Sequence, residues 1–495
     1  MNVPSKSLES LVPAGIKIIA TGAIAMITGL SVDSRATKPG HLFAALPGSN
    51  VHGASFVKYA VRMGAVAVLT DQAGYDLAQS EGGYDVPYVI ADDPRMALAK
   101  VAAAWFGAQP EVMVAVTGTN GKTSTTNFLR QIWEALGFNA VNFGTTGVEG
   151  AISAPLSHTT PEPIVLHELL AQLAAAGVTH GAMEASSHGL AQRRLDGVRL
   201  RAAGFSNLSR DHLDYHKDFA DYFTAKAGLF RRLLPKGATA VLNIDDPKGA
   251  ALVVEMQGTR PLITVGQTVD ADIQIADIRY RMEGLDVLVK YQGHSHMLAL
   301  NLLGGFQAEN VMLAAGLAIA CGANAEAVFK TLPQLQTVRG RMELVATRKN
   351  GASIFVDFSH TPEALETALQ AMRPHVMGRL LVVFGAGGDR DKGKRPQMGK
   401  AALNNADVLF VTDDNPRSEV PADIRAQILL ACPQANEIGD RATAILSAVD
   451  ALKAGDALLI AGKGHETGQI VGDDILDFND AEQASIAVAA LEGMQ

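Results

Sequence analysis

Short apolar runs alternate with helix-periodic stretches along almost the whole chain. Apolar runs bounded by turn residues predict buried strands, and apolar positions three or four residues apart predict the helices between them. Strands that alternate with helices in this way are typical of parallel sheets covered by helices. The strands that we expect span residues 41–46, 65–70, 87–91, 112–116, 181–186, 204–208, 240–244, 354–358, 380–385, 408–412 and 457–461.

The alternating pattern separates into three blocks. They span residues 1–93, 94–337 and 338–495. Within the second block, residues 272–302 are richer in strand-forming residues, and leucine recurs at every second position near their end, as in a half-buried strand. We therefore expect an α/β protein of three domains: a smaller α/β domain, a central doubly wound sheet with a β-rich insertion, and a C-terminal Rossmann-like domain.

The stretch Thr117–Ser124, with the sequence TGTNGKTS, carries the clearest chemical signal. It lies between the apolar run Val112–Val116 and a stretch of helical periodicity, Thr125–Leu136. Glycines between a strand and a helix let backbone N–H groups converge on phosphate oxygens, and the helix N-terminus adds partial positive charge. Lys122 would reach the outer phosphates and the Thr123 hydroxyl would bind Mg²⁺, so the central domain is predicted to be of the P-loop type.

One position departs from the strict P-loop motif. The motif has glycine where this chain has Val116. A simple glycine turn between strand and helix is therefore the alternative to a phosphate-binding loop.

Composition and charge narrow the function classes. A chain of 495 residues exceeds a single core, and a net charge of −9 argues against a general nucleic-acid-binding surface. The two cysteines, Cys321 and Cys432, lie in expected helices without metal-ligand spacing, which indicates buried thiols and a reducing compartment. The N-terminus lacks a signal-peptide pattern and no apolar run reaches about 18 residues. We therefore expect a cytoplasmic protein without membrane insertion.

Four polar side chains of the second block are candidates for chemistry. Glu184 ends an expected strand, where a carboxylate can hold a second Mg²⁺, although it could instead cap the next helix. His212 and His216 lie four residues apart beside two aspartates, but without a third nitrogen or sulfur ligand a zinc site is disfavoured. His212 is equally compatible with a Mg²⁺ ligand and with a structural histidine. Lys226 lies in an apolar helical stretch, where a lysine is ordinarily exposed.

Three loops of the third block each follow an expected strand and carry polar residues. They span Gly385–Asp391, Asp413–Arg417 and Ala461–Glu466. The glycine-rich loop alone is also compatible with a simple turn. Together the loops supply two arginines, Arg390 and Arg417, and a carboxylate, which is what a zwitterionic amino acid needs for binding.

With these residues in place, the chain resembles the Mur ligases, most closely those of the MurE type, over all three blocks. The motifs occur in family order: TGTNGKTS, AMEASSHGL, NLSRDHLDYH, GRME, HTPEAL, GGDRDKGKRPQMG, DDNPR and AGKGHE. The resemblance implies an ATP-dependent ligase of peptidoglycan synthesis that adds a third amino acid to UDP-N-acetylmuramoyl-L-alanyl-D-glutamate. The run Asp414–Arg417 is similar to the versions that add meso-2,6-diaminopimelate instead of L-lysine. ATP would be a co-substrate and Mg²⁺ the cofactor, and we expect a monomer that binds no nucleic acid.

The resemblance also implies site residues. Those implied in catalysis are Lys122, Glu184, His212 and Lys226. Those implied for Mg²⁺ are Thr123, Glu184, His212 and Lys226, the last as a carbamate. Those implied for ATP are Gly118, Thr119, Asn120, Gly121, Lys122, Thr123, Asn243, Asp245, Asn310, Arg341 and Asp357. Those implied for the UDP-linked substrate are Val32, Ser34, Ser49, Asn50, Val51, His158, Thr159, Thr160, Ser186, Gln192 and Arg194. Those implied for diaminopimelate are Arg390, Asp414, Asn415, Pro416, Arg417, Gly462 and Glu466.

The chain departs from the family pattern near several of these positions. Arg339 stands where proline is usual, and Gln307 and His158 stand where asparagine is common. Phe358 and Ser359 replace a common tyrosine and alanine. None of these departures removes a charged residue that the chemistry requires.

Three other functions remain as alternatives. One is a ligase of the same family that adds L-lysine. Another is a folylpolyglutamate synthetase, which shares the phosphate loop but has no need of the DDNPR run or of a UDP-binding first block. The third, from another class, is a regulatory scaffold whose ATP site only drives domain closure.

Overall fold

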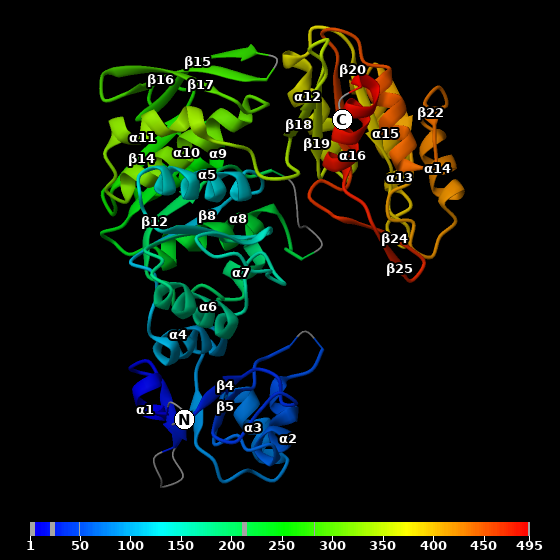
Figure 1. Ribbon diagram of the computed structural model, residues 1–495. Coiled ribbons are helices and arrows are strands. Elements are labelled where there is room, and N and C mark those ends of the chain that lie inside the picture. Colours follow the sequence, from blue (N-terminus) through cyan, green and yellow to red (C-terminus); the bar gives the residue numbers. More distant parts are fainter. Residues whose placement is uncertain (1–4, 20–24, 49, 210–214, 282, 494–495) are drawn as a thin grey trace. The chain divides into compact units, whose positions relative to one another are not determined.

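A computed structural model describes residues 5–19, 25–48, 50–209, 215–281 and 283–493 (Figure 1). Contacts divide the chain into two compact units. The first consists of residues 1–266 and 313–328, and the second of residues 267–312 and 329–495. Strands and helices alternate in both units, so the predicted α/β class is confirmed. The division into three domains stays a prediction.

The first unit begins with a five-stranded sheet in the order β2-β7-β6-β5-β4. All neighbours are parallel except β2, which pairs antiparallel with β7. The three strands predicted here are confirmed, each slightly shorter than expected. The elements are β1 (Lys6–Ser7), α1 (Leu8–Leu11), β2 (Lys17–Ile19), β3 (Met26–Ile27), β4 (Gly29–Ser31), β5 (His41–Ala44), the 3₁₀ turn η1 (Gly53–Phe56), α2 (Val57–Arg62), β6 (Ala67–Thr70), α3 (Gln72–Ser80) and β7 (Tyr88–Ile90).

The helix that follows, α4 (Pro94–Phe106), packs on this first sheet. Its residues Ala97, Leu98 and Val101 share one buried cluster with Leu69 of β6. Asp93 caps its N-terminus by accepting a hydrogen bond from the backbone N–H of Met96, which ends the preceding strand region and starts the helix.

The second sheet of the first unit has the order β10-β9-β11-β8-β12-β13-β14. Only β10 is antiparallel to its neighbour, so the carboxyl ends of six strands share one edge, where ligands collect in such sheets. The elements are β8 (Val112–Thr117), α5 (Lys122–Ala135), β9 (Ala140–Gly144), β10 (Gly147–Gly150), α6 (Pro163–Ala175), β11 (His180–Glu184), α7 (Ser187–Ala191), β12 (Leu200–Phe205), α8 (Phe219–Gly228), the π-helical turn η2 (Leu229–Leu233), β13 (Thr239–Asn243), α9 (Pro247–Met256) and β14 (Leu262–Gly266).

One predicted strand of this sheet was placed wrongly. Residues 204–208 were expected to be a strand, but β12 starts at Leu200 and ends at Phe205. The exposed Arg201 interrupts the apolar run and hid the true start. Leu208 lies beyond the strand because its backbone N–H donates to the Asp246 carboxylate at 2.7 Å instead of joining the sheet.

The predicted β-rich insertion is confirmed in the second unit. It is an antiparallel meander of β15 (Ile273–Arg281), β16 (Gly284–Tyr291) and β17 (His294–Leu300). Leu298 and Leu300 are buried, whereas Met297 before them is 64% exposed and Ala299 between them is exposed, which is the alternation of a half-buried strand. The helical elements that follow it in the chain are α10 (Phe306–Ala320), α11 (Ala325–Thr331) and the 3₁₀ turn η3 (Leu332–Gln334).

The C-terminal sheet of the second unit has the order β18-β19-β23-β20-β21-β22, parallel except for β18. Successive residues of one strand enter cores on opposite faces, as Phe355 and Ile354 do, so the sheet is doubly wound. The elements are β18 (Glu343–Thr347), β19 (Ser353–Asp357), α12 (Pro362–Met372), η4 (Arg373–His375), β20 (Leu380–Phe384), α13 (Lys394–Asn405), β21 (Val408–Val411), α14 (Pro421–Leu429), β22 (Asn436–Glu437), α15 (Arg441–Asp450), β23 (Ala457–Ala461), β24 (Gly468–Val471), β25 (Asp474–Asp477) and α16 (Asp480–Glu492).

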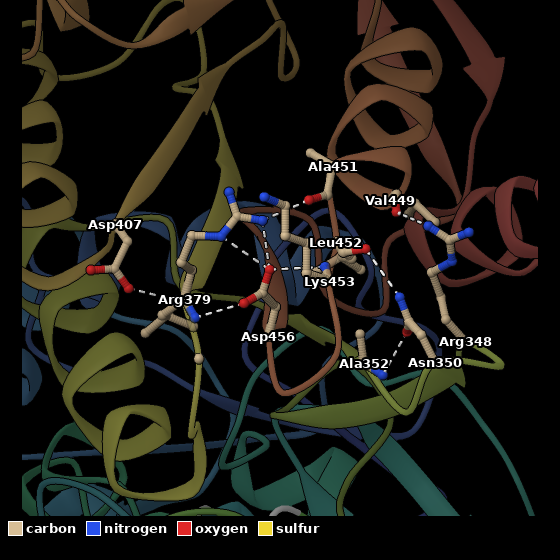
Figure 2. A network of polar contacts seen from close by, with 12 residues as sticks. Arg348, Asn350, Ala352, Arg379, Asp407, Val449, Ala451, Leu452, Lys453 and Asp456 are labelled. Atoms are coloured by element: carbon tan, nitrogen blue, oxygen red, sulfur yellow. Dashed lines mark hydrogen bonds and ion pairs between the residues drawn. The ribbon is translucent and has the colours of Figure 1, made fainter.

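A polar network closes the C-terminal end of α15 (Figure 2). Three side chains donate to backbone carbonyls at and just beyond this end: Arg348 to Val449 at 2.8 Å, Asn350 to Leu452 at 3.1 Å, and Arg379 to Ala451 at 2.7 Å. The last carbonyls of a helix have no partner within the helix. These donors satisfy them, and the two guanidinium groups also match the negative end of the helix dipole.

Both cysteines are free, but neither lies inside a helix. Cys321 directly follows α10 and is half-buried, whereas Cys432 lies beyond the end of α14 and is fully buried. Burial raises the pKa of the Cys321 thiol to about 12 and also raises that of Cys432. Among the residues that the structure describes, no helix combines the length and apolar character needed to cross a bilayer.

Candidate active site

The predicted phosphate loop connects β8 to α5, which lie side by side in Figure 1. Gly118 and Gly121 both have positive φ, +149° and +83°. A Cβ at Gly118 would collide with the Ser206 hydroxyl, so this position requires glycine. Gly121 occupies the N-cap of α5 without a side chain to cap it. The helix therefore starts at Lys122, three residues earlier than predicted, and its first N–H groups can receive an anion.

Two lysines converge on one carbonyl of this loop. Lys122 donates to the backbone oxygens of Gly118 and Thr119 at 3.0 and 2.7 Å, and Lys226 donates to that of Gly118 at 2.6 Å. Lys226 is 1% exposed and its ammonium lies 4.5 Å from the centre of the Tyr222 ring. The alternative of an exposed surface lysine is therefore wrong, because this face of α8 is turned into the core.

Glu184 contacts the phosphate loop from the end of β11. It accepts a hydrogen bond from the Thr123 hydroxyl at 2.9 Å and another from the backbone N–H of Thr145 at 2.8 Å, and it is 1% exposed. The alternative role as a helix cap is wrong, because Ser186 caps α7 by accepting from the backbone N–H of Gly189.

The pair of Thr123 and Glu184 suits a hard cation. A hydroxyl and a carboxylate oxygen within hydrogen-bond distance are the kind of ligands that Mg²⁺ prefers, so the residues present fit the metal that the resemblance implies. The predicted ligand His212 lies outside the described residues. Within the described part of the chain, no group of three or more His, Cys, Asp or Glu side chains could hold a metal ion.

Residues predicted to bind the dipeptide form a connected group beside Glu184. The Thr160 hydroxyl donates to the Glu184 carbonyl at 2.9 Å and accepts from the backbone N–H of Ser186 at 3.0 Å. Arg194 donates to the Thr160 carbonyl at 2.7 Å and to the Gln192 amide oxygen at 2.8 Å. The Thr159 hydroxyl lies 3.2 Å from that of Thr145, and His158 contacts Ser157.

The residues predicted for the UDP part follow two paired parallel strands, β4 and β5. Val32 and Val51 are 41% and 53% exposed, Asn50 is exposed and Ser34 is buried. Ser49 lies outside the described residues. Exposed apolar side chains near the carboxyl ends of adjacent strands offer a surface on which a flat base can lie.

The remaining predicted ATP residues occur in both units. In the first, Asn243 ends β13 and accepts from the backbone N–H of Asp245 at 3.1 Å. In the second, Asp357 accepts from the backbone N–H of Met342 at 2.8 Å, and burial raises the pKa of its carboxyl. The Arg341 guanidinium lies 4.9 Å from the centre of the Phe358 ring, while the Asn310 amide donates to Gln307 at 3.0 Å.

The three loops of the predicted amino-acid pocket are joined in the second unit. Arg417 donates to the Gly388 carbonyl at 2.9 Å, and the Asn415 amide donates to Glu466 at 3.0 Å. Gly462, with φ +120°, allows close approach to Asp414, whose carboxylate oxygen would lie 2.7 Å from a Cβ there. Pro416 precedes Arg417 in the same loop, and Arg390 lies at the exposed end of the first loop.

Two non-glycine residues of these loops adopt left-handed backbone, Asp389 at φ +53° and Arg417 at φ +51°. Such strain persists only where surrounding contacts hold it. The Ser418 hydroxyl donates to the Asp389 carboxylate at 2.7 Å, and the backbone N–H of Asp389 donates to Glu419 at 2.7 Å. These bonds join the two loops that carry the predicted arginines.

Several supporting residues were missed from sequence. The fully buried Arg395 donates to both Glu419 oxygens, and this hydrogen bonding lowers the pKa of Glu419 to about 2. Arg441 and Asp480, both essentially unexposed, form an ion pair at 2.7 Å, and Arg441 also donates to the Ala461 carbonyl. A local sequence motif does not show whether a charged side chain is buried. The motif AGKGHE contains a further buried lysine, Lys463.

Family-level sequence matches cover most of the chain. The Mur ligase family catalytic domain matches residues 26–106, the Mur ligase middle domain residues 116–318, and the Mur ligase glutamate ligase domain residues 340–464.

Individual relatives are similar over nearly their whole length. The UDP-N-acetylmuramoyl-L-alanyl-D-glutamate--2,6-diaminopimelate ligase of Brucella melitensis is 50% identical over 466 residues, 94% of each chain. The ligase of the same name from Bradyrhizobium diazoefficiens is 49% identical over 470 residues, 94% of this chain and 95% of the relative.

Solved structures agree. A structure of UDP-N-acetylmuramoyl-L-alanyl-D-glutamate--2,6-diaminopimelate ligase, 33% identical, superposes with a TM-score of 0.74 over 94% of this chain and 95% of the other. A folylpolyglutamate synthase of Mycobacterium tuberculosis, 18% identical with a TM-score of 0.58 over 75% of this chain and 92% of the other, shares the fold. Because the matched domains span most of the chain and near-full-length relatives are about half identical, the chain belongs to the Mur ligase family.

Proposed function

We propose that this protein is an ATP-dependent ligase that joins meso-2,6-diaminopimelate to the D-glutamate of UDP-N-acetylmuramoyl-L-alanyl-D-glutamate in peptidoglycan synthesis. The relatives that are about half identical over nearly the whole chain carry this activity in their names. The single structural observation that supports it best is the hydrogen bond between Thr123 of the phosphate loop and Glu184 at the end of β11. It joins a phosphate-binding loop to an acidic oxygen ligand, as ATP chemistry requires.

The first step forms an acyl phosphate. One of the two free carboxylates of the D-glutamate attacks the γ-phosphorus of ATP, and ADP leaves. The N–H groups at the start of α5 and the Lys122 ammonium bind the crowded phosphate oxygens and stabilise their charge. Thr123, Glu184, His212 and a carbamate on Lys226 would hold Mg²⁺, which supplies further neutralisation of that charge.

The carbamate follows from ordinary amine chemistry. The neutral Lys226 amine attacks the carbon of CO₂, and the amine loses a proton as the carbamate anion forms. Lys226 is buried, and its amine lies 2.6 Å from the Gly118 carbonyl of the phosphate loop. The modification converts a cation into two oxygen ligands at the phosphate loop.

The second step forms the amide. The amine of diaminopimelate attacks the activated carbonyl, and inorganic phosphate leaves. The distal amino-acid centre of diaminopimelate bears both an ammonium and a carboxylate. Glu466 suits the ammonium, and the guanidinium groups of Arg390 and Arg417 suit the carboxylate through paired hydrogen bonds. Lysine lacks that carboxylate and would leave an arginine without its partner, which costs several kcal/mol where the group is desolvated.

Two features of the whole protein belong to the same proposal. The free cysteines are compatible with a reducing compartment, and we expect the enzyme to act in the cytoplasm. We also expect it to act as a monomer.

The test is ADP release by the purified protein with UDP-N-acetylmuramoyl-L-alanyl-D-glutamate, ATP and Mg²⁺, comparing meso-diaminopimelate with L-lysine. We expect release that depends on diaminopimelate and is at least about a hundredfold less efficient with lysine. Equal release with lysine would keep the ligase but contradict the selectivity. If the protein binds ATP but releases no ADP with either amino acid, the regulatory scaffold is favoured. ADP release with a folate and glutamate would favour a folylpolyglutamate synthetase.

A further inference from the structure

Lys463, in the loop after β23, joins two loops of the amino-acid pocket while being completely buried. Its ammonium donates to the Asn415 amide oxygen at 2.9 Å and to the Gly468 carbonyl at 2.8 Å. The Asp414 carboxylate lies 3.7 Å from it as an ion-pair partner. Three acceptors surround a group that has three N–H bonds only when it is protonated. The geometry therefore fits a charged lysine.

The contact with Lys463 fixes the orientation of the Asn415 amide. The amide oxygen accepts from the Lys463 ammonium and from the backbone N–H of Ile470, both at 2.9 Å. With two donors on the oxygen side, the amide NH₂ must lie on the other side, where it donates to Glu466 at 3.0 Å. If Lys463 were absent, rotation of the Asn415 amide would break fewer hydrogen bonds than it does with the lysine present. The amide oxygen could then turn toward the Glu466 carboxylate, and the two oxygens would repel each other.

The orientation of Asn415 in turn determines what Glu466 can bind. One carboxylate oxygen of Glu466, Oε2, accepts from Asn415. The other, Oε1, accepts no hydrogen bond from the residues that the structure describes, and the side chain is half-buried. A carboxylate held at one oxygen and open at the other presents a directed acceptor to a ligand ammonium at little further entropic cost.

We propose that Lys463 is a positioning residue of the amino-acid pocket, which holds the Asn415 amide so that Glu466 is oriented to receive an ammonium group of the incoming amino acid. The identity of that amino acid rests on the proposed function. Burial lowers the pKa of Lys463, and the Asp414 carboxylate opposes this effect. Lys463 itself contacts no substrate in this scheme and acts only through Asn415.

A purely structural role for Lys463 is the competing explanation. In that case the lysine joins the loops, and its loss weakens the fold or all steps of the reaction together. The two roles differ in which kinetic constant changes and in whether the effect requires Glu466. Both differences can be measured on the full-length enzyme.

The first experiment is the substitution Lys463→Met, which keeps the length of the side chain and removes its donors. We expect the KM for diaminopimelate to rise roughly ten- to hundredfold, the change that follows from loss of a charged hydrogen bond. The KM for ATP and the kcat should change by less than about twofold. Lys400→Met, at an exposed position of α13, is the matched control and should behave as wild type. An equal loss in all constants, or an unchanged KM for diaminopimelate, would overturn the proposal.

A double-mutant cycle with Glu466→Gln then tests the route of the effect. If Lys463 acts through Asn415 on Glu466, the double variant should have the same KM for diaminopimelate as Glu466→Gln alone. Multiplied effects would assign Lys463 a separate structural role. Thermal melting monitors folding, and Lys463→Gln, which retains one neutral donor group, replaces Lys463→Met if that variant does not fold. An inactive wild-type protein would instead contradict the proposed function, and the assignment of Lys463 with it.

Discussion

At the scale of single residues, the chemistry of the site depends on which charged groups meet at the phosphate loop. Lys122 and Lys226 both donate to the Gly118 carbonyl, and Glu184 accepts from Thr123 next to it. Two amines and one carboxylate thus contact residues 118–123 of the phosphate loop. A nucleotide triphosphate with a divalent cation carries the charges that complement this set.

Lys122→Ala should abolish amino-acid-dependent ADP release, lowering kcat by at least about a thousandfold, because the charge that develops on the phosphate loses its nearest cation. Initial-rate assays at saturating substrates check this. Lys100→Ala, at an exposed position of α4, is the matched control. Substantial turnover by the Lys122 variant would remove this lysine from the mechanism.

Arg417→Asn should raise the KM for diaminopimelate at least about tenfold with little change in the KM for ATP, because a charge-paired fork is lost. Asparagine tolerates the left-handed backbone at φ +51° better than alanine does, so the change removes the guanidinium without adding strain. Arg279→Asn, at a side chain that is 75% exposed, is the control. If the Arg417 variant binds diaminopimelate normally, the carboxylate of the substrate is held elsewhere.

His167 should make stability depend on pH. It is 1% exposed, and burial, aided by the charge of Arg199, lowers its pKa to about 4. The unfolded state, with an ordinary pKa near 6.5, takes up the proton first as the pH falls, so stability is complete above about pH 7 and is lost on the way to pH 4.

The contribution of His167 should amount to about 2 kcal/mol between pH 7.5 and pH 5. Urea unfolding of wild type and His167→Leu at both pH values measures it as the difference between their pH responses. Parallel responses in the two proteins would show that His167 is not buried as a neutral ring.

At the scale of elements, helix α15 connects a functional loop to a structural anchor. Its first residue, Arg441, is paired with Asp480 and donates to the Ala461 carbonyl at the start of the loop that contains Lys463 and Glu466. The carbonyls at its other end are bound by the three side chains of Figure 2. Satisfied backbone groups at a helix end restrict fraying there.

Arg379→Met should lower the free energy of unfolding by about 2 kcal/mol, because it leaves the 3%-exposed Asp456 without its guanidinium partner and removes the bond to Ala451. Burial raises the pKa of Asp456, but the hydrogen bonds from Arg379 and Lys453 together outweigh it and lower the pKa. The stability that this carboxylate contributes is therefore present at neutral pH and is lost as the pH falls below its usual range.

The measurement for Arg379 is urea unfolding at pH 7.5 and at pH 3, which lies below the ordinary pKa of an aspartate. The variant should lose more stability relative to wild type at the higher pH than at the lower one. Arg279→Met, at the exposed position used above, should be neutral. A variant as stable as wild type would mean that backbone donors alone satisfy Asp456.

At the scale of the whole molecule, the net charge of −9 governs which ligands the protein attracts over a distance. The proposed substrates are anionic, so their binding depends on lysine and arginine side chains at the site, because the protein as a whole is negatively charged. Such groups act over a distance of roughly a Debye length, about 8 Å at physiological salt.

The protein should sediment as a single species of about 52 kDa, the mass of one chain, at enzyme concentrations up to about 10 µM, where weak surface contacts stay dissociated. It should also pass through a heparin column at pH 7 because of its net negative charge. Analytical ultracentrifugation checks the first expectation. A dimer mass would contradict the monomer.

The sequence was sufficient for the alternation of strands and helices and for the glycine-containing turn between β8 and α5, although it did not show strands such as β9, β14 and β18. Periodicity located β23 to the residue and most other strands within a few residues, because apolar runs and turn residues report local burial. It failed at β12, where the exposed Arg201 concealed the start of a strand whose extent is set by pairing with β8 and β13. Pairing between distant segments leaves no trace in local periodicity.

The glycines of the chemical motif were readable in the same way, since the positive φ angles of Gly118 and Gly121 are a local backbone property that favours glycine. What tertiary structure alone decided is the environment of each charge. Lys226 is buried and not exposed, Glu184 contacts Thr123 instead of capping a helix, and Lys463 is buried and donates to Asn415. These properties depend on which distant atoms surround a group, and the free energy of a charge is determined by those neighbours and by its exclusion from water.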